Sequence, residues 1–383
     1  MKGYKGYIVL AASIVIQVGL GSVYAWSVFV PSLTSSFGLT QAQSQIIFGA
    51  TIAVFTLSMV FAGRLQNRYG PAPVAFIGGT LFGTGYLTAS FSGGSFVPLL
   101  LGVGFIAGAG IGFGYVCPIA TCIKWFPKKK GLISGLAVAG FGGGAVLLSA
   151  LAGRLFAEGK SVLEVFRFVG LWYGAAIVAA SLFLSNPYKT TTRSTGESRI
   201  GRQVFSDRRF WRLVTGIWAG TFGGLLVIGN LQPIGLASNI PPALAAAAVG
   251  SFAVGNSLGR LGWGALIDGI GDRAIPASLL FLCSAIAMLL LPFPAPWMFV
   301  AVSMLAGFGF GACFVVYMTQ TANDFGAENM ASIYPLIFLA YGFSGIVGPT
   351  VGGWLYDVSG SYFPAILVGA GVVLFGVVAQ HLL

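Results

Sequence analysis

The stretch GRLQNRYG at residues 63–70 recurs as GALIDGIG at residues 264–271, 201 positions further along the chain. Both copies have a glycine at each end and an Asn or Asp at the fifth position. Shorter matches lie at nearly the same offset: Gly153-x-Leu155 with Gly353-x-Leu355, and Pro31 with Pro233. Matches at one fixed spacing indicate an internal repeat. The sequence therefore predicts two similar halves.

The composition places both halves in a membrane. Of the 383 residues, 56% are hydrophobic and 8% are charged, and the mean hydropathy is +0.90. Soluble domains contain about 25% charged residues, so a soluble globular protein of this length is excluded. The 58 glycines show no three-residue period, which excludes collagen. Because a helix needs about 20 apolar residues to cross the hydrocarbon core, the chain has room for about a dozen spans.

Twelve apolar segments can be delimited along the chain. They cover residues 7–33, 41–62, 72–91, 96–122, 131–156, 164–185, 210–236, 242–267, 274–292, 296–322, 329–356 and 361–383. Lipid requires every backbone polar group to bond internally, and these runs lack the ten-residue alternation of a barrel strand. We expect an all-α membrane protein with twelve transmembrane helices in two six-helix halves. The first segment is too long for a cleaved signal, so we expect it to be a span.

The polar residues predict the domain boundaries and the topology. Residues 186–209 are rich in Thr, Ser and Arg, which is typical of a cytoplasmic linker between halves at 1–185 and 210–383. Sixteen of the 20 Lys and Arg residues precede the first segment or lie in even-to-odd connections. By the positive-inside rule, both termini are cytoplasmic and the protein crosses the cell (inner) membrane several times. The net charge of +11 then reflects topology, not nucleic-acid binding.

The residue types that carry catalysis or bind metals are nearly absent from the apolar segments. The four cysteines lie inside these segments without metal-ligand spacing, so they are expected to pack as small residues. The one histidine, His381, lies at the end of the last segment. The segment interiors contain no paired carboxylates and no nucleophile beside a base. We therefore expect no enzymatic activity, no cofactor and no metal site. Separately, we expect the protein to be a monomer.

Arg260 is the one charged residue well inside an apolar segment. A central arginine costs about 2.5–3.5 kcal/mol on insertion scales, and no Asp or Glu lies in a central position to neutralise it. Its planar fork suits a carboxylate, and Asn256 lies one turn away on the same helix face. A single cation favours a monoanion over a dicarboxylate. The alternative is that Arg260 extends to the cytoplasm and pairs with Asp268.

Aromatic residues are candidates for the rest of the cavity. Tyrosine presents an apolar wall with a hydroxyl group, which suits a small hydroxy or keto acid. The predicted substrate-binding residues beside Arg260 and Asn256 are Tyr24, Tyr115, Tyr317, Phe338 and Tyr341. Tyr115 and Tyr341 are favoured because they lie in glycine-rich segments, where small residues let helices approach closely.

The repeated Gly-x-x-x-(Asn/Asp)-x-x-Gly pattern resembles the loop signature of the major facilitator superfamily. That resemblance implies alternating access, with the solute site near mid-membrane between the two halves. Arg64, Arg68 and Asp268 lie in these loops. We expect them to form cytoplasmic contacts that hold one gate shut.

Two further motifs resemble the monocarboxylate transporters. GSVYAW at residues 21–26 resembles the glycine-to-tryptophan motif that opens these transporters, and WFPKKKGLISGLAVAG at 125–140 resembles their second signature. The chain also resembles the related bacterial oxalate/formate antiporters. In the monocarboxylate family span 8 carries an Asp-x-x-x-Arg pair whose arginine binds the carboxylate; here Arg260 matches the arginine, and Asn256 replaces the acid. Span 11 has Tyr341-Gly342-Phe343 where the antiporters have a lysine, which argues against a dianion such as oxalate.

The resemblance implies transport of a monocarboxylate such as L-lactate or pyruvate, together with a proton, across the lipid bilayer. One alternative is an oxalate/formate-type anion exchanger. Another is a sensor that keeps the transporter fold and only binds its carboxylate. Flux of a labelled acid separates a carrier from a sensor.

Overall fold

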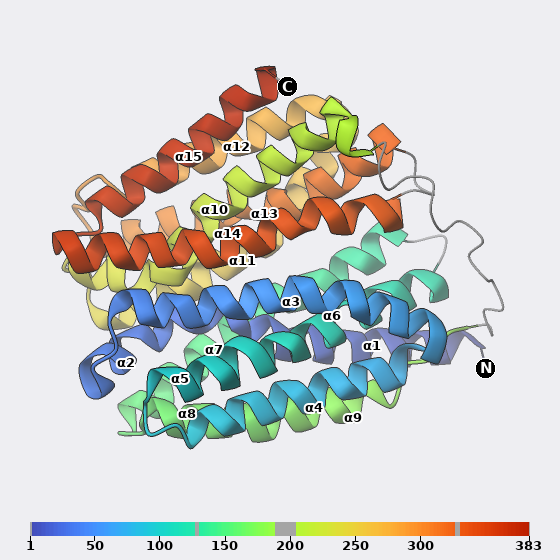
Figure 1. The fold of residues 1–383 in the computed structure, drawn as a ribbon, viewed down its shortest axis with the longest axis horizontal. Coiled ribbons are helices and arrows are strands. Elements are labelled where there is room, and N and C mark those ends of the chain that lie inside the picture. Colours follow the sequence, from blue (N-terminus) through green and yellow to red (C-terminus); the bar gives the residue numbers. More distant parts are fainter. Residues whose placement is uncertain (1, 127–129, 188–203, 326–329, 383) are drawn as a thin grey trace.

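The computed structural model describes residues 2–126, 130–187, 204–325 and 330–382. All regular structure in these ranges is helical, and none of them contains a strand. Figure 1 shows two groups of long helices, one above the other, that differ in their position along the chain. One contains the helices up to Ser181 and the other contains those from Arg208 onward. The predicted all-α architecture is confirmed.

The N-terminal group begins with a broken helix. It contains α1 (Lys2–Gly21), the 3₁₀ segment η1 (Ser22–Val28), α2 (Val30–Phe37), α3 (Gln41–Tyr69), α4 (Pro71–Ser90), α5 (Phe96–Leu99), the π segment η2 (Leu100–Ala107), α6 (Gly108–Trp125), α7 (Lys130–Ala157), α8 (Val162–Phe168), the π segment η3 (Val169–Tyr173) and α9 (Gly174–Ser181). The predicted span 7–33 is thus interrupted at η1. Gly21 there lies directly against the backbone of Phe141, and the tightened turns after it place Tyr24 in the interior.

The C-terminal group is built from longer uninterrupted helices. It contains the 3₁₀ turn η4 (Val204–Ser206), α10 (Arg208–Ala237), α11 (Pro242–Ile270), the 3₁₀ turn η5 (Gly271–Arg273), α12 (Ala274–Met288), α13 (Pro296–Phe325), α14 (Met330–Ser359) and α15 (Phe363–Leu382). Helix α12 ends at Met288, four residues earlier than expected, because the following segment contains three prolines and a residue before proline avoids the helical region.

Helix ends follow local capping signals. Ser161 and Glu164 form a capping box that starts α8 two residues before the predicted segment. Asp207 caps α10 by accepting a hydrogen bond from the Arg209 backbone N–H. Hydrogen bonds from the Arg209 guanidinium also hold the pKa of the Asp207 carboxyl below its usual range. The predicted linker at 186–209 falls largely outside the described residues.

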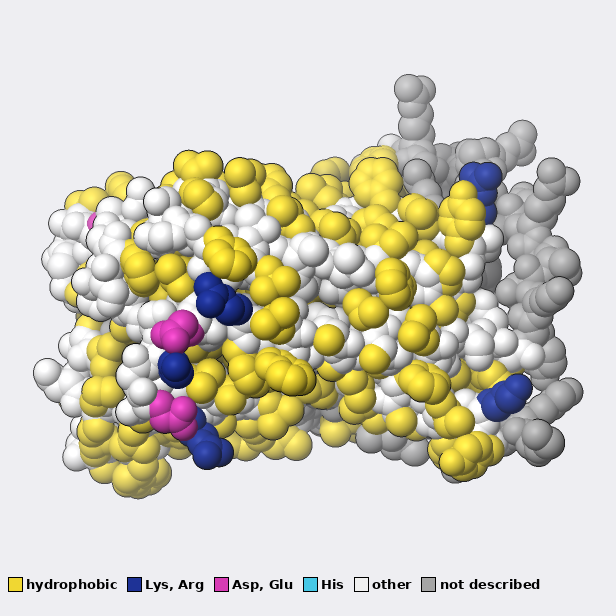
Figure 2. Space-filling model, turned by 90° about the horizontal axis from the view of Figure 1, so that it is seen from below, with side chains coloured by type: hydrophobic (Ala, Val, Ile, Leu, Met, Phe, Trp, Pro, Cys, Tyr) yellow, Lys and Arg dark blue, Asp and Glu magenta, His cyan; other side chains and the backbone are white. Residues whose placement is uncertain are grey.

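Ten helical stretches of the described residues are long and apolar enough to cross a membrane. One of them, Pro242–Met288, covers both α11 and α12, and α4 is not among the ten. Figure 2 shows hydrophobic side chains over the middle of one face, with Lys and Arg toward both ends and Asp and Glu toward one of them. This distribution matches a lipid belt between two polar boundaries. The number twelve and the cytoplasmic position of both termini stay predictions.

The two groups of helices meet through two equivalent pairs. Helix α3 packs against α14, and α7 packs against α11. Glycines allow both approaches, because Gly49 faces the backbone of Gly345 and Ile346, and Gly142 faces the backbone of Ala253. Helix α10 also packs against η1, so the broken first helix contacts the opposite half. The site described next lies where these contacts converge.

Candidate functional site

Helix α11 carries Arg260 into the interior, where the side chain is 7% exposed. Its Nε donates a hydrogen bond of 3.3 Å to Oδ1 of Asn256, one turn earlier on the same helix. The guanidinium carbon lies 4.3 Å from the centre of the Phe314 ring on α13. Stacking on an aromatic face stabilises a desolvated cation and leaves the edge of its plane available. Asp268 is exposed further along α11, and the ion pairs among the described residues do not join it to Arg260.

Arg260 and Asn256 each have one hydrogen-bond donor without a partner among the described residues. These donors are Nη1 of Arg260 and Nδ2 of Asn256, and both atoms are buried. A buried donor without an acceptor costs about 1–3 kcal/mol, and more when it is charged. Both atoms belong to the same turn of α11 and both require an acceptor. The pair is therefore chemically complementary to an anion with two oxygens, such as a carboxylate.

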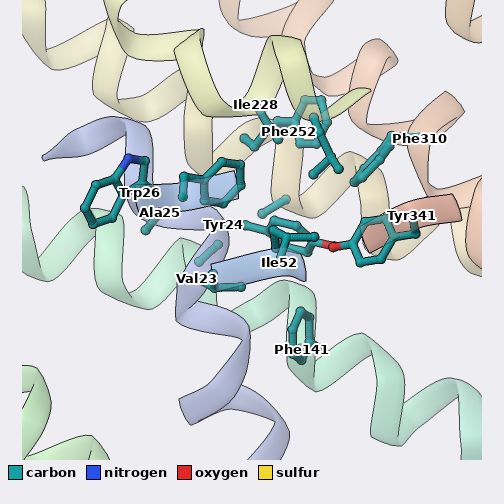
Figure 3. Packing of buried hydrophobic residues seen from close by; sticks show 14 of the residues in the cluster. Val23, Tyr24, Ala25, Trp26, Ile52, Phe141, Ile228, Phe252, Phe310 and Tyr341 are labelled. Carbon is teal, nitrogen blue, oxygen red and sulfur yellow. The ribbon is translucent and has the colours of Figure 1, made fainter. Parts of the chain in front are cut away.

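Aromatic rings from both halves form a connected cluster that contacts Arg260 through Phe314; we call this cluster the aromatic shell. Its members are Tyr24 of η1, Phe55 of α3, Tyr115 of α6, Phe141 of α7, Phe310 and Phe314 of α13, and Phe338 and Tyr341 of α14. Neighbouring ring centres lie 5.0–6.3 Å apart, mostly edge to face. Figure 3 shows Tyr24 and Tyr341 facing each other, with Phe141 and Phe310 to either side. The shell makes the surroundings of Arg260, which is 7% exposed, largely apolar.

The two halves meet inside the shell through one hydroxyl pair. The hydroxyl oxygens of Tyr24 and Tyr341 lie 2.9 Å apart and form a hydrogen bond, and both side chains are buried. One donated proton joins the pair, which leaves one hydroxyl hydrogen and several lone pairs for another polar group. The shell thus has a second polar point besides Arg260 and Asn256.

The structure brings most of the predicted binding residues together. Asn256 contacts Arg260, while Tyr24, Tyr115, Phe338 and Tyr341 all belong to the aromatic shell. Tyr317 lies outside it: its hydroxyl is buried against Gly216 of α10, in the part of the bundle that contains Arg212. The structure adds Phe55, Phe141, Phe310 and Phe314, which no local signal in the sequence distinguishes from packing residues.

The predicted gate residues are not joined to one another in this structure. The side chain of Arg64 lies outside the described residues, Arg68 is exposed over the ring of its neighbour Tyr69, and Asp268 is exposed. At this end Arg212 of α10 instead forms two ion pairs with other segments, with Asp272 at 3.9 Å and Asp324 at 3.5 Å. Sequence reasoning missed this cluster because its three members come from separate segments. Groups of His, Cys, Asp and Glu that could hold a metal are not found within the described ranges.

Comparison with known proteins identifies the class. A model of the Major Facilitator Superfamily matches residues 11–348 and 221–383, so the chain belongs to this family. It is a multi-pass membrane transporter, not an enzyme, and the cell membrane (the inner membrane in a bacterium) is the location that fits.

Its relatives include carriers of small carboxylates by name. The chain is 26% identical to the oxalate:formate antiporter of Oxalobacter formigenes, over 90% of this chain and 83% of that protein. It is 25% identical to monocarboxylate transporter 2 of Rattus norvegicus, over 97% of this chain and 81% of that protein. A solved bacterial homologue of the human lysosomal transporter Spinster has the same fold, with a TM-score of 0.73 at 18% identity over 99% of this chain and 96% of the other.

Proposed function

We propose that the protein carries a small monocarboxylate such as L-lactate or pyruvate across the membrane, with the carboxylate bound between Arg260 and Asn256. The observation that carries the proposal is the pair of buried donors without partners, Arg260 Nη1 and Asn256 Nδ2, inside an aromatic shell contributed by both halves. The names of the carboxylate-carrying relatives support the same substrate class.

The charge balance of the site favours a monoanion. Arg260 is the one charged side chain among the buried polar residues of the described ranges. A bound monoanion neutralises it, so the loaded site contains no net charge while the halves rearrange around it. A dianion would bring a second negative charge into an aromatic shell without a second cation to neutralise it, and burying an unpaired charge costs several kcal/mol.

We further propose that one proton accompanies each monoanion, so that net uptake is electroneutral. The titratable groups of the shell itself are tyrosine hydroxyls. We therefore assign the proton to an acid nearer the membrane boundary or to the loaded site. The second candidate function is pure exchange. It is favoured by the unpaired Arg260, because an empty carrier must return with this charge buried and uncompensated, and by the antiporter among the relatives.

Uptake into proteoliposomes tests the substrate class. We expect saturable uptake of labelled L-lactate and pyruvate, stimulated when the outside is more acidic than the inside. Formate and oxalate serve as the competing substrates: rapid oxalate exchange with negligible L-lactate uptake would favour the exchanger. Saturable L-lactate binding without any flux would contradict a carrier and leave the sensor.

A potassium diffusion potential tests the coupling. At a fixed pH gradient, the initial rate of L-lactate uptake is expected to stay the same when the potential is varied, because one proton and one monoanion carry no net charge together. A steep dependence of the rate on voltage would contradict electroneutral coupling. A rate that ignores the pH gradient would point to pure exchange.

Asn256→Asp is expected to make lactate exchange depend on pH. Above its pKa the new carboxylate pairs with Arg260 and competes with the substrate carboxylate, whereas below its pKa the neutral acid leaves Arg260 free. With equal pH on both sides, exchange by the variant should be about tenfold slower above the pKa of the new acid than below it, a loss of about 1.4 kcal/mol of substrate interaction. Wild type and the exposed control Asn239→Asp should change far less. A variant as insensitive to pH as wild type would argue that the substrate does not compete at Arg260.

A further inference from the structure

The N-terminus of α3 is held by an acid from the opposite half. The first N–H groups of a helix have no partner within the helix. Thr40 and Gln43 form a capping box that satisfies two of them, the N–H groups of residues 40 and 43. The other two belong to Gln41 and Ala42, and both donate to the carboxylate of Asp357 on α14, at 3.3 and 3.0 Å. The capping of α3 is therefore complete only when the two halves are in contact here.

One turn before Asp357, Gly353 provides the close approach. A Cβ at Gly353 would lie 2.9 Å from the backbone carbonyl carbon and oxygen of Gln41 and the backbone nitrogen of Ala42. The α3 N-terminus is therefore seated directly on the α14 backbone at this glycine. One turn deeper along α3, Gln45 donates a 2.8 Å hydrogen bond to the carbonyl of Gly229 on α10. Consecutive turns of α3 are thus bonded to two helices of the other half.

The internal repeat shows that this contact is specific to one half. Gly153 is the repeat counterpart of Gly353, yet a Cβ at Gly153 would meet no atom within 4 Å. Glu158, at the matching end of α7, is exposed and has no ion pair with another described residue. A glycine and an acid thus occur at similar places in both halves. Of these two pairs, Gly353 and Asp357 contact a helix of the other half, whereas Gly153 and Glu158 do not.

We propose that Asp357 and Gly353 form a latch that holds the two halves closed at this end of the bundle and opens in each transport cycle. A carboxylate at a helix N-terminus bonds to the N–H groups and to the positive end of the helix dipole. Separation of the halves removes this acid from Gln41 and Ala42 and returns both N–H groups to water. The positive-inside pattern places the latch on the non-cytoplasmic side. Its role in a cycle rests on the transport function proposed above, whereas the contact itself is independent of the substrate.

Distances between the halves test the latch without any substrate. Spin labels on Ser95→Cys and Ser238→Cys, exposed loop positions of the two halves at this end, report separation by double electron–electron resonance in lipid nanodiscs. Asp357→Asn removes the charge. Gly353→Ala adds a methyl group that pushes the two backbones apart at the same contact without changing any charge. We expect both variants to raise the ratio of open to closed populations about fivefold, with Asp357→Glu close to wild type.

The controls use the repeat. Glu158→Gln removes a comparable surface charge and Gly153→Ala adds the same methyl group where space is open, so both should keep the wild-type distribution. Wild-type distributions in both Asp357→Asn and Gly353→Ala would overturn the latch. Equal shifts in the two controls would overturn it as well. Failure of lactate uptake in the wild type would reject the proposed function and leave these distances unaffected.

Discussion

Arg260→Ala should lower the rate of carboxylate uptake at least about thirtyfold in proteoliposomes. Truncating one partner of a buried charge interaction costs about 2–5 kcal/mol, and every 1.4 kcal/mol corresponds to a factor of ten. The guanidinium is the buried cation of the aromatic shell, and no other described charged side chain reaches the interior to replace it. The protein should still accumulate, because the substitution also removes the cost of burying an unpaired charge.

Arg260→Lys separates charge from geometry. Lysine keeps the positive charge and loses both the planar fork and the stacked contact with Phe314, so uptake should also fall severely. Arg273→Ala, a change in the 3₁₀ turn η5 outside the shell, is the matched control and should retain wild-type uptake. Uptake by Arg260→Ala within a few fold of wild type would show that the anion binds elsewhere.

Gly259→Val should prevent correct assembly of the C-terminal half. Helices α11 and α13 cross through a seam of four glycines, in which a Cβ on Gly255, Gly259, Gly307 or Gly311 would collide with the backbone of the facing helix. At Gly259 the obstacle is the carbonyl of Phe308, which cannot move like a side chain. Overpacking costs about 1–3 kcal/mol even where side chains can adjust, so the loss here should be larger.

The seam also positions the site, because α11 carries Arg260 and α13 carries Phe314. Gly259→Val should therefore yield little monodisperse protein after extraction, with a lowered unfolding temperature for what remains. Gly371→Val on α15 is the matched control, since a Cβ there meets open space. Equal yields and unfolding temperatures for both variants would contradict a tight α11–α13 crossing.

Local signals account for what the sequence predicts correctly. Apolar length predicts the helices because lipid allows few other structures. The contact of Asn256 with Arg260 follows from helical spacing alone, and the structure shows it. The role of the two residues in binding stays a prediction, made because a charge inside an apolar segment is costly. These signals lie within one segment and need no knowledge of how the segments meet.

The rest of the site depends on contacts between segments. Phe55, Phe141, Phe310 and Phe314 join the shell because three different helices converge there, and their sequence context is that of ordinary packing residues. Tyr317 shares its helix with Phe314 but is buried against Gly216 of α10. Three residues along a helix move a side chain about 4.5 Å along the axis, which is enough to give it different neighbours. The break at η1 depends on the approach of Gly21 to Phe141, which no local pattern encodes.

The most direct test of the proposed site is equilibrium binding of labelled L-lactate to the purified protein in nanodiscs. Binding by the wild type and by Arg273→Ala should be saturable and displaced by unlabelled pyruvate, because both acids present a carboxylate to Arg260 and Asn256. Binding by Arg260→Ala should be undetectable at the same concentrations. Saturable lactate binding of equal affinity in Arg260→Ala would contradict the assignment of Arg260 as the anion site.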